Sequence, residues 1–242
     1  MSFVERYSAQ MAFHEIGEAG QVKLKYSSVL IIGCGALGTH MADLLVRAGI
    51  GRVVICDPDK IELSNLPRQT LFSESDIGKN KAAVAKDALA KANQDVEIIE
   101  YQESFDAQTA EKIAENVNLI MDATDNMESR YFINEFAKSK KVPWIYSGVV
   151  GASGQVFPVL PDGPCFECIY PRQGASAFAL MPCDLGVLNV APATAATIAT
   201  TLAIKMLVGK SFEPKLIVFD LWKPSLDTFV IARDPSCTAC GC

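Results

Sequence analysis

The sequence has few of the residues that several protein classes need. Histidine occurs only at His14 and His40, so catalysis by a Ser-His-Asp or Cys-His arrangement is not indicated. The 22 Lys and Arg are outnumbered by 28 Asp and Glu, and no basic stripe is present. We therefore expect no nucleic-acid partner. The first residues contain no apolar leader, and we expect a cytoplasmic protein.

Long apolar runs are equally scarce. The longest, residues 190–208, contains several Thr residues and Lys205, which predicts a core helix rather than a membrane span. Cysteine, in contrast, is abundant, with eight in 242 residues. In a chain without a leader, this number indicates a reducing compartment and thiols that serve a metal or chemistry rather than disulfides.

Short apolar runs alternate with helical patterns over the first 150 residues. This rhythm predicts a Rossmann-like, doubly wound α/β fold with a mostly parallel sheet. The expected strands are 29–32, 53–56, 96–99, 119–121 and 144–146, and the expected helices are 37–48, 84–92, 113–117 and 132–137.

The alternation of strand and helix patterns ends at about residue 150. Runs at 155–160, 216–219 and 228–232 predict antiparallel strands that extend the same sheet. The aperiodic stretch 172–182 predicts a mobile loop. We therefore expect a single domain, 1–242, whose two halves are 1–150, which binds the nucleotide, and 151–242.

A glycine-rich loop follows the first predicted strand. Gly33, Gly35, Ala36 and Gly38 lie in a G-x-G-x-x-G pattern that opens a helix. Glycine lets the backbone approach phosphates, and the helix N-terminus offers unpaired N–H donors. Asp57 ends the next strand, where a carboxylate accepts hydrogen bonds from ribose hydroxyls. These features predict a nucleotide site, and the same fold without a nucleotide is the alternative.

Polar residues beyond Asp57 separate ATP chemistry from that of a nicotinamide dehydrogenase. Asn65, Arg68, Gln69 and Lys81 follow in the chain. A dehydrogenase has no use for an Arg and an Asn past the ribose carboxylate. An enzyme that attacks the α-phosphate of ATP uses fixed cations and donors to stabilise the charge that builds there. For any single residue a solvated polar loop is the alternative, but together they predict adenylation.

Asp125 follows the predicted strand 119–121, within the run Asp122 to Asn126. The carboxyl end of a strand is where open α/β sheets hold their ligands. Because Mg²⁺ prefers few carboxylates together with phosphate and water, Asp125 is a candidate magnesium ligand. We interpret Asp122 as a structural cap of the turn.

Two cysteine pairs have the spacing of metal ligands. Cys165 and Cys168, and Cys237 and Cys240, form C-x-x-C motifs that together predict a Cys₄ zinc site. Their separation means that the metal would join the end of the chain to an internal loop. A redox C-x-x-C is the alternative, which Pro164 and the terminal position of the second pair disfavour.

These segments resemble the ThiF/MoeB/HesA family, prokaryotic relatives of the ubiquitin-activating enzymes. The resemblance covers essentially the whole chain. It rests on RYS at 6–8, EIG at 15–17, SNLPRQ at 64–69, GKNK at 78–81 and DATDN at 122–126.

The resemblance implies an ATP-dependent adenylyltransferase that activates the C-terminal glycine of a small ubiquitin-like sulfur carrier ending in Gly-Gly. It implies ATP, Mg²⁺ and Zn²⁺, a homodimer and a separate sulfur donor protein, with residues 151–242 binding carrier and zinc. Arg68, Lys81, Asp125 and Cys183 are the implied catalytic residues. The nucleotide-binding set is Gly33, Gly35, Ala36, Gly38, Asp57, Asp59, Asn65, Arg68, Gln69, Lys81, Asp125 and Asn126.

Two positions depart from the pattern or leave it open. Family members usually carry an Arg three residues after Arg6 that reaches the neighbouring subunit's ATP pocket, and here the residue is Ala9. Either Arg6 covers the role or phosphate contact across the dimer is weaker. Cys183 matches the cysteine that in thiamine-type members bonds to the carrier, although many relatives keep it without needing it.

Three other functions are open at this point. One is a tRNA-modifying dehydratase of the same superfamily, which the acidic balance disfavours. Another is an NAD-dependent oxidoreductase, supported by the glycine loop alone. The third is a non-catalytic nucleotide-binding scaffold, which Ala9 leaves open.

Overall fold

The computed structural model describes residues 3–173 and 186–241. Cys183 and most of the stretch predicted as a mobile loop lie outside the described residues.

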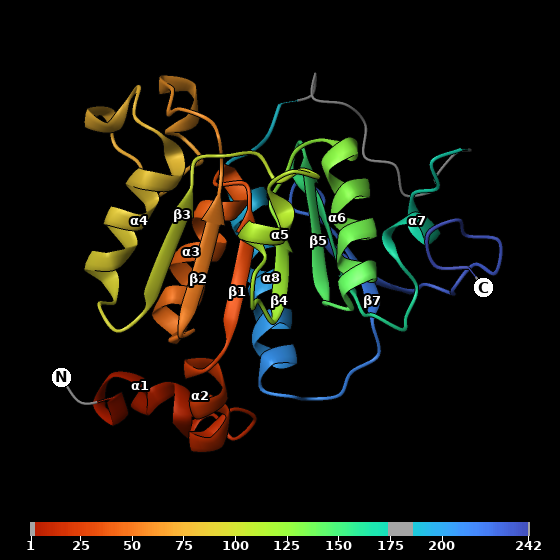
Figure 1. The fold of residues 1–242 in the computed structure, drawn as a ribbon, viewed down its shortest axis with the longest axis horizontal. Helices are drawn as coiled ribbons and strands as arrows, with labels where there is room; N and C mark the ends of the chain where they lie inside the picture. Colours follow the sequence, from red (N-terminus) through yellow and green to blue (C-terminus); the bar gives the residue numbers. More distant parts are fainter. Residues whose placement is uncertain (1–2, 174–185, 242) are drawn as a thin grey trace.

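An 8-stranded sheet forms the centre of the molecule, in the order β3-β2-β1-β4-β5-β6-β7-β8 (Figure 1). The neighbouring strands β3, β2, β1, β4 and β5 are parallel. Strands β6, β7 and β8 extend the sheet in antiparallel orientation, as the sequence predicts. The strand bounds are β1 Ser28–Ile32, β2 Arg52–Cys56, β3 Glu97–Tyr101, β4 Leu119–Asp122, β5 Trp144–Val150, β6 Ser153–Val159, β7 Lys215–Asp220 and β8 Ser225–Val230.

The order of the strands reverses around β1. Val29 pairs with Val53 of β2 on one side and with Leu119 of β4 on the other. In open α/β sheets the crevice at such a switch point, outside the carboxyl ends of the strands, is where ligands bind. The fold therefore places the loops after β1, β2 and β4 at the expected ligand site.

Helices cover both faces of the sheet, and the sheet separates the hydrophobic core into two clusters. Helices α3, α4 and α8 contribute to one cluster, and α5, α6 and α7 to the other. Helices α1 and α2 pack below the sheet in the view of Figure 1. The helix bounds are α1 Phe3–Ala12, α2 Gly17–Lys25, α3 Ala36–Ala48, α4 Lys81–Ala92, α5 Ala110–Ile113, α6 Met127–Lys140, α7 Phe166–Ile169 and α8 Val190–Leu207, with 3₁₀ turns η1 Leu63–Asn65 and η2 Glu74–Asp76.

Helix α8 is the apolar run for which the sequence predicts a core helix. In the described part of the chain it alone is long and apolar enough to cross a membrane, with 18 residues and a mean hydropathy of 1.4. Ala195, Ala199 and Ala203 are nevertheless fully buried against the sheet and α3. Thr194 Oγ1 and Thr201 Oγ1 donate to carbonyl oxygens one turn earlier in the helix.

The structure differs from the sequence prediction in a few segments. The helix expected over 113–117 is wrong, because α5 ends at Ile113 and Asn116 adopts a left-handed φ of 57°. Val117 then leads directly into β4. The strand expected over 228–232 begins earlier, at Ser225, where it pairs with Asp220 across the β7–β8 hairpin.

Candidate nucleotide site and metal centre

Two glycines of the loop after β1 are needed for close packing. Gly33 has a φ of +96°, and a Cβ there would lie 2.7 Å from the Ala123 carbonyl oxygen. A Cβ on Gly38 would lie 2.0 Å from the Gly33 carbonyl oxygen. The absence of a side chain at these two positions therefore lets the loop after β1 pack against the loop after β4, and the first turn of α3 against the Gly33 carbonyl group.

Gly35 has a different environment. A Cβ built on it would meet only Gln69 Nε2 within 4 Å, at 3.8 Å, among the described atoms. Gly35 is the N-cap of α3 and has no side chain with which to satisfy the first N–H groups of the helix. The loop thus leaves an open approach to N–H donors, which is the arrangement that anions use.

The Gln69 side chain lies beside this approach. Gln69 is only 3% exposed, and its Oε1 is buried without a hydrogen-bond partner in the described structure. Buried polar atoms are normally hydrogen-bonded, so the unpaired Oε1 indicates a polar group that the amide has yet to meet. The Nε2 end of the amide, a donor, is the atom nearest Gly35.

Asp57 braces the glycine loop. It is 4% exposed, its Oδ2 accepts from Cys34 N at 2.6 Å, and its Oδ1 accepts from Asp59 N at 2.8 Å. Burial raises the pKa of Asp57, and the two backbone N–H donors oppose that rise. Asp57 lies at the strand end where a ribose carboxylate is expected, and its role toward ribose stays a prediction.

Lys81 places a cation on the same edge of the sheet. Its Nζ lies 2.9 Å from Asp59 Oδ2, and its side chain is only 10% exposed. Asn80 caps α4 by accepting from Ala83 N at 3.1 Å, and its Nδ2 donates to the Asp57 carbonyl oxygen at 3.3 Å. The start of α4 is therefore tied to the loop after β2.

Asn65 is the last residue of η1, and Arg68 lies in the turn that follows it. Asn65 is 8% exposed, and its Oδ1 accepts from Glu62 N at 3.1 Å. Arg68 is half-buried, and its Nη1 donates to the Ser64 carbonyl oxygen at 2.6 Å. Asn65 therefore fixes the turn from which Arg68 extends.

The loop after β4 carries an exposed carboxylate. Asp125 is exposed, and Asn126 Nδ2 donates to its Oδ1 at 3.4 Å. Asn126 Oδ1 also caps α6 by accepting from Ser129 N at 2.9 Å. Fully buried Asp122 accepts from Thr124 N at 2.9 Å and Thr124 Oγ1 at 2.6 Å, so it is the turn cap that the sequence predicts.

The structure thus gathers most of the predicted nucleotide residues at one edge. Direct contacts join the Gly33 loop to the Ala123 loop, Cys34 to Asp57, and Lys81 to Asp59. An exposed carboxylate beside such an edge fits Mg²⁺, which needs few protein ligands when phosphates and waters supply the rest. The roles of the individual residues stay predictions, and Cys183 lies outside the described residues.

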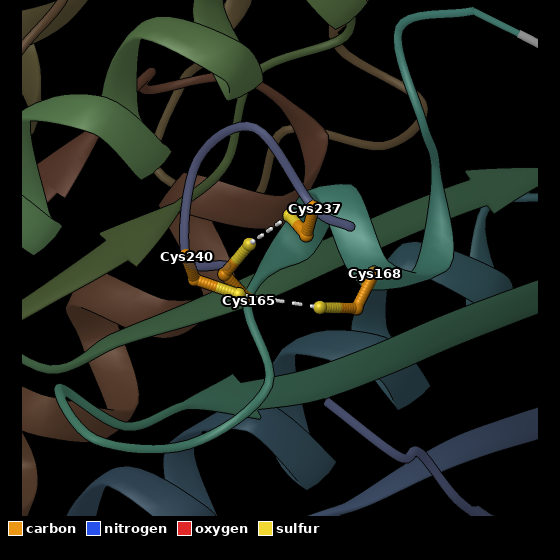
Figure 2. A group of neighbouring side chains, drawn as sticks. All are labelled: Cys165, Cys168, Cys237 and Cys240. Atoms are coloured by element: carbon orange, nitrogen blue, oxygen red, sulfur yellow. Dashed lines mark hydrogen bonds between the residues drawn. The ribbon is translucent and has the colours of Figure 1, made fainter. Parts of the chain in front are cut away.

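Two segments far apart in the sequence bring four thiols together (Figure 2). The Sγ atoms of Cys165, Cys168, Cys237 and Cys240 all lie within 4.8 Å of one another. The Cys165–Cys237 and Cys168–Cys240 Sγ distances are 3.6 and 3.4 Å. A tetrahedral zinc with Zn–S bonds of about 2.3 Å needs S–S separations of about 3.8 Å, so the donor set fits Zn²⁺.

Local contacts hold the two cysteine-bearing loops in place. Burial raises the pKa of Cys240, but hydrogen bonds from Cys168 and Cys165 outweigh it and lower the pKa to about 7. The Cys240 carbonyl oxygen accepts from Arg233 Nε at 2.8 Å. Asn134 Oδ1 of α6 accepts from Phe166 N at 3.1 Å, which fixes the start of α7 between Cys165 and Cys168.

Comparison with known proteins identifies the family of this chain. The model of the ThiF family matches residues 7–239. The chain belongs to the ThiF family.

Curated relatives in this family match nearly the whole chain. It is 39% identical to the sulfur carrier protein ThiS adenylyltransferase of Bacillus subtilis, over 98% of this chain and 71% of that protein. It is 32% identical to the sulfur carrier protein adenylyltransferase of Thermus thermophilus, over 98% of this chain and 91% of that protein. The SAMP-activating enzyme E1 of Haloferax volcanii is 30% identical, over 98% and 89%.

Solved structures agree with this assignment. E. coli MccB, in a crystal structure with ATP, superposes with a TM-score of 0.82 and is 27% identical, covering 98% of this chain and 74% of that one. The E. coli MccB structure titled with MccA-N7isoASN gives a TM-score of 0.85 and 26% identity, over 100% and 76%.

One buried residue next to this site, Arg130, was not predicted from the sequence. Arg130 Nε lies 3.2 Å from Asp122 Oδ2, and its Nη2 donates to the Thr124 carbonyl oxygen at 2.7 Å. The available signal was spacing, since Arg130 shares the buried face of α6 with Ile133 and Ala137, one and two turns on.

Proposed function

We propose that this chain is an ATP-dependent adenylyltransferase that activates the C-terminal glycine of a small ubiquitin-like sulfur carrier ending in Gly-Gly. The observation that supports it most is the edge at the β1–β4 switch point. There the open approach at Gly35 lies beside the orphaned Gln69 amide and the loops that hold Lys81 and Asp125. The names of the relatives support the carrier as substrate.

The proposed reaction needs few catalytic groups. A protein C-terminal carboxylate has a pKa of about 3.5 and is already ionised, so its attack on the α-phosphate needs no general base. The chain has to place two anions in line and offset their repulsion. Lys81 and Arg68 supply positive charge for this, and pyrophosphate leaves as the acyl-adenylate forms.

Two metal ions belong to the proposal. Asp125 would hold Mg²⁺, which when bound would neutralise charge on the phosphates. Cys165, Cys168, Cys237 and Cys240 would hold a structural Zn²⁺, because a closed Cys₄ set leaves no position for substrate.

The remaining parts of the proposal concern assembly. We infer a cytoplasmic homodimer with a separate sulfur donor protein and no nucleic-acid or membrane partner. Arg6 Nη1 donates to the Ala92 carbonyl oxygen at 3.3 Å, and its Nε lies 3.9 Å from Asp95 Oδ2. Because these contacts hold Arg6 against its own chain, we propose that it does not replace the Arg expected at Ala9. Phosphate contact across the dimer would then be weaker.

Exchange of labelled pyrophosphate into ATP tests the proposal, with and without candidate carriers. Carrier-dependent exchange supports it, and exchange that needs tRNA instead would favour the dehydratase of the same superfamily. Calorimetric titration with ATP and with NAD is the second arm. Tight NAD binding without ATP binding would overturn the proposal in favour of an oxidoreductase.

A further inference from the structure

Arg130 lies at the junction of three structural segments. Its side chain is 11% exposed and its partner Asp122 is fully buried. Besides its bonds to Asp122 Oδ2 and the Thr124 carbonyl oxygen, Nη2 lies 3.4 Å from the Ser147 carbonyl oxygen of β5. The guanidinium also lies 5.2 Å from the centre of the Tyr146 ring. One side chain therefore connects α6, the loop after β4, and β5.

These contacts immobilise the backbone immediately before Asp125. Asp122 binds Thr124 through its backbone N–H and hydroxyl, while Arg130 binds the Thr124 carbonyl oxygen. On the other side of Asp125, Asn126 is fixed as the cap of α6. Asp125 itself projects to solvent from a turn that is held at both ends.

Stability alone is a poor explanation for this pair. Removing two charges from water is costly, and buried ion pairs can often be replaced by apolar residues with no loss of stability. What Arg130 supplies that an apolar residue could not is a fixed direction for the Thr124 carbonyl group. That direction sets where the Asp125 carboxylate lies at the carboxyl edge of the sheet.

We propose that Arg130 is a positioning residue that holds the Thr124 turn so that the Asp125 carboxylate meets the Mg²⁺ of bound Mg·ATP. The inference rests on the proposed function, because it takes the ligand of the edge to be Mg·ATP. Residues that orient a metal ligand from behind typically change metal affinity by about 10–100-fold when replaced.

The test compares Arg130→Lys with the wild-type full chain. Lysine keeps the charge opposite Asp122, so the fold is retained, but it cannot bond to Asp122, Thr124 and Ser147 together. Calorimetry measures ATP binding with and without Mg²⁺. We expect the gain in affinity that Mg²⁺ gives to ATP to fall about 10-fold or more, with Mg²⁺-free binding unchanged. Amide exchange over residues 122–129, without nucleotide, should be faster in the variant.

Lys138→Met is the matched control on the same helix. Lys138 Nζ donates to the Pro161 carbonyl oxygen at 2.8 Å, two turns from Arg130 and away from the Asp125 turn. This variant should change neither the Mg²⁺ effect nor the exchange of residues 122–129. Thr124→Val is a second probe, since it removes the hydroxyl bond to Asp122 without leaving a buried charge unpaired, and it should show the same loss as Arg130→Lys.

The failure of this inference differs from the failure of the proposed function. If wild type binds Mg·ATP but catalyses no carrier-dependent exchange, the function is wrong while the binding comparison still tests Arg130. If exchange is present, and Arg130→Lys lowers the melting temperature but leaves both the Mg²⁺ effect and amide exchange unchanged, Arg130 is a structural residue only. If wild type binds no ATP, both ideas fall.

Discussion

Lys81 Nζ lies 2.9 Å from Asp59 Oδ2, which joins a side chain that is 10% exposed to one that is 66% exposed. The Asn80 cap fixes the backbone at the start of α4, so the ion pair is not needed to place the lysine backbone at this edge. An exposed carboxylate is a weak partner, because solvent screens it. A phosphate approaching the edge can therefore compete with Asp59 for a cation that is already in place.

The first prediction follows from that relationship. Lys81→Met should lower carrier-dependent pyrophosphate exchange by about 10²–10³-fold, because it removes a fixed charge from the developing transition state. Lys79→Met is the matched control, since Lys79 is 58% exposed and pairs with Asp76 three residues earlier. The rate of carrier-dependent pyrophosphate exchange is measured for both purified variants. Equal losses in both variants would mean that general surface charge, rather than Lys81, is responsible.

The second prediction concerns pH. Burial raises the pKa of Asp57 in the folded protein above its ordinary value. A raised folded pKa contributes stability below the unfolded pKa, and that contribution is lost as pH rises through the folded value. The free energy of unfolding of wild type, relative to that of Asp57→Asn, should thus be larger near pH 4 than near pH 7. Urea unfolding at several pH values measures this, and a difference independent of pH contradicts it.

The parallel half of the fold could be predicted because its signals are local. Strand β1 is a continuous apolar run buried along its whole length, and the loop after it must be glycine where Gly33 and Gly38 pack against carbonyl oxygens. Helix α1 has no comparable signal, since Tyr7 is its only buried residue. Helix α5 was misplaced because the left-handed turn at Asn116 leaves no mark in an apolar pattern.

The candidate site shows the same limit. Motif spacing predicted Gly35, Lys81 and Asp125 as site residues, and the structure places them at two helix starts and in the loop after β4. Arg130 could not be predicted in this way, since a lone arginine in a helix is normally solvated, and only the fold shows that it meets Asp122 in the interior. The four cysteines were predictable as two pairs, but their closure into one cluster depends on where the end of the chain lies.

The third prediction is that the protein contains about one zinc per chain, held by the four thiols. Cys237→Ser should lower the melting temperature, because the binding energy of the metal contributes to folding. Thr238→Ser, in the same loop, should retain the zinc and the stability. Elemental analysis of protein purified without added metal, with thermal unfolding, checks both. A zinc content near zero in folded wild type would assign the thiols another role.

The last prediction assigns the chemistry to residues. Arg68→Ala and Asp125→Ala should each abolish carrier-dependent pyrophosphate exchange while leaving the fold intact, which circular dichroism checks. Arg68 extends from a turn fixed by Asn65, so its loss removes charge stabilisation worth about 10²–10³ in rate. The loss of Asp125 should be at least as severe, because the magnesium it is proposed to hold would neutralise the triphosphate.

Cys183→Ser supplies the contrast for that assignment. Adenylation precedes any covalent sulfur step, so this variant should retain exchange even if Cys183 later bonds to the carrier. The opposite pattern, with exchange lost in Cys183→Ser and kept in Asp125→Ala, would reverse the roles. The attacking group would then be a thiolate rather than the carboxylate of the carrier, and the enzyme would be a thiol-dependent acyl transferase. We expect the first pattern, because an ionised carboxylate needs placement and charge compensation, and the edge at the β1–β4 switch point offers both.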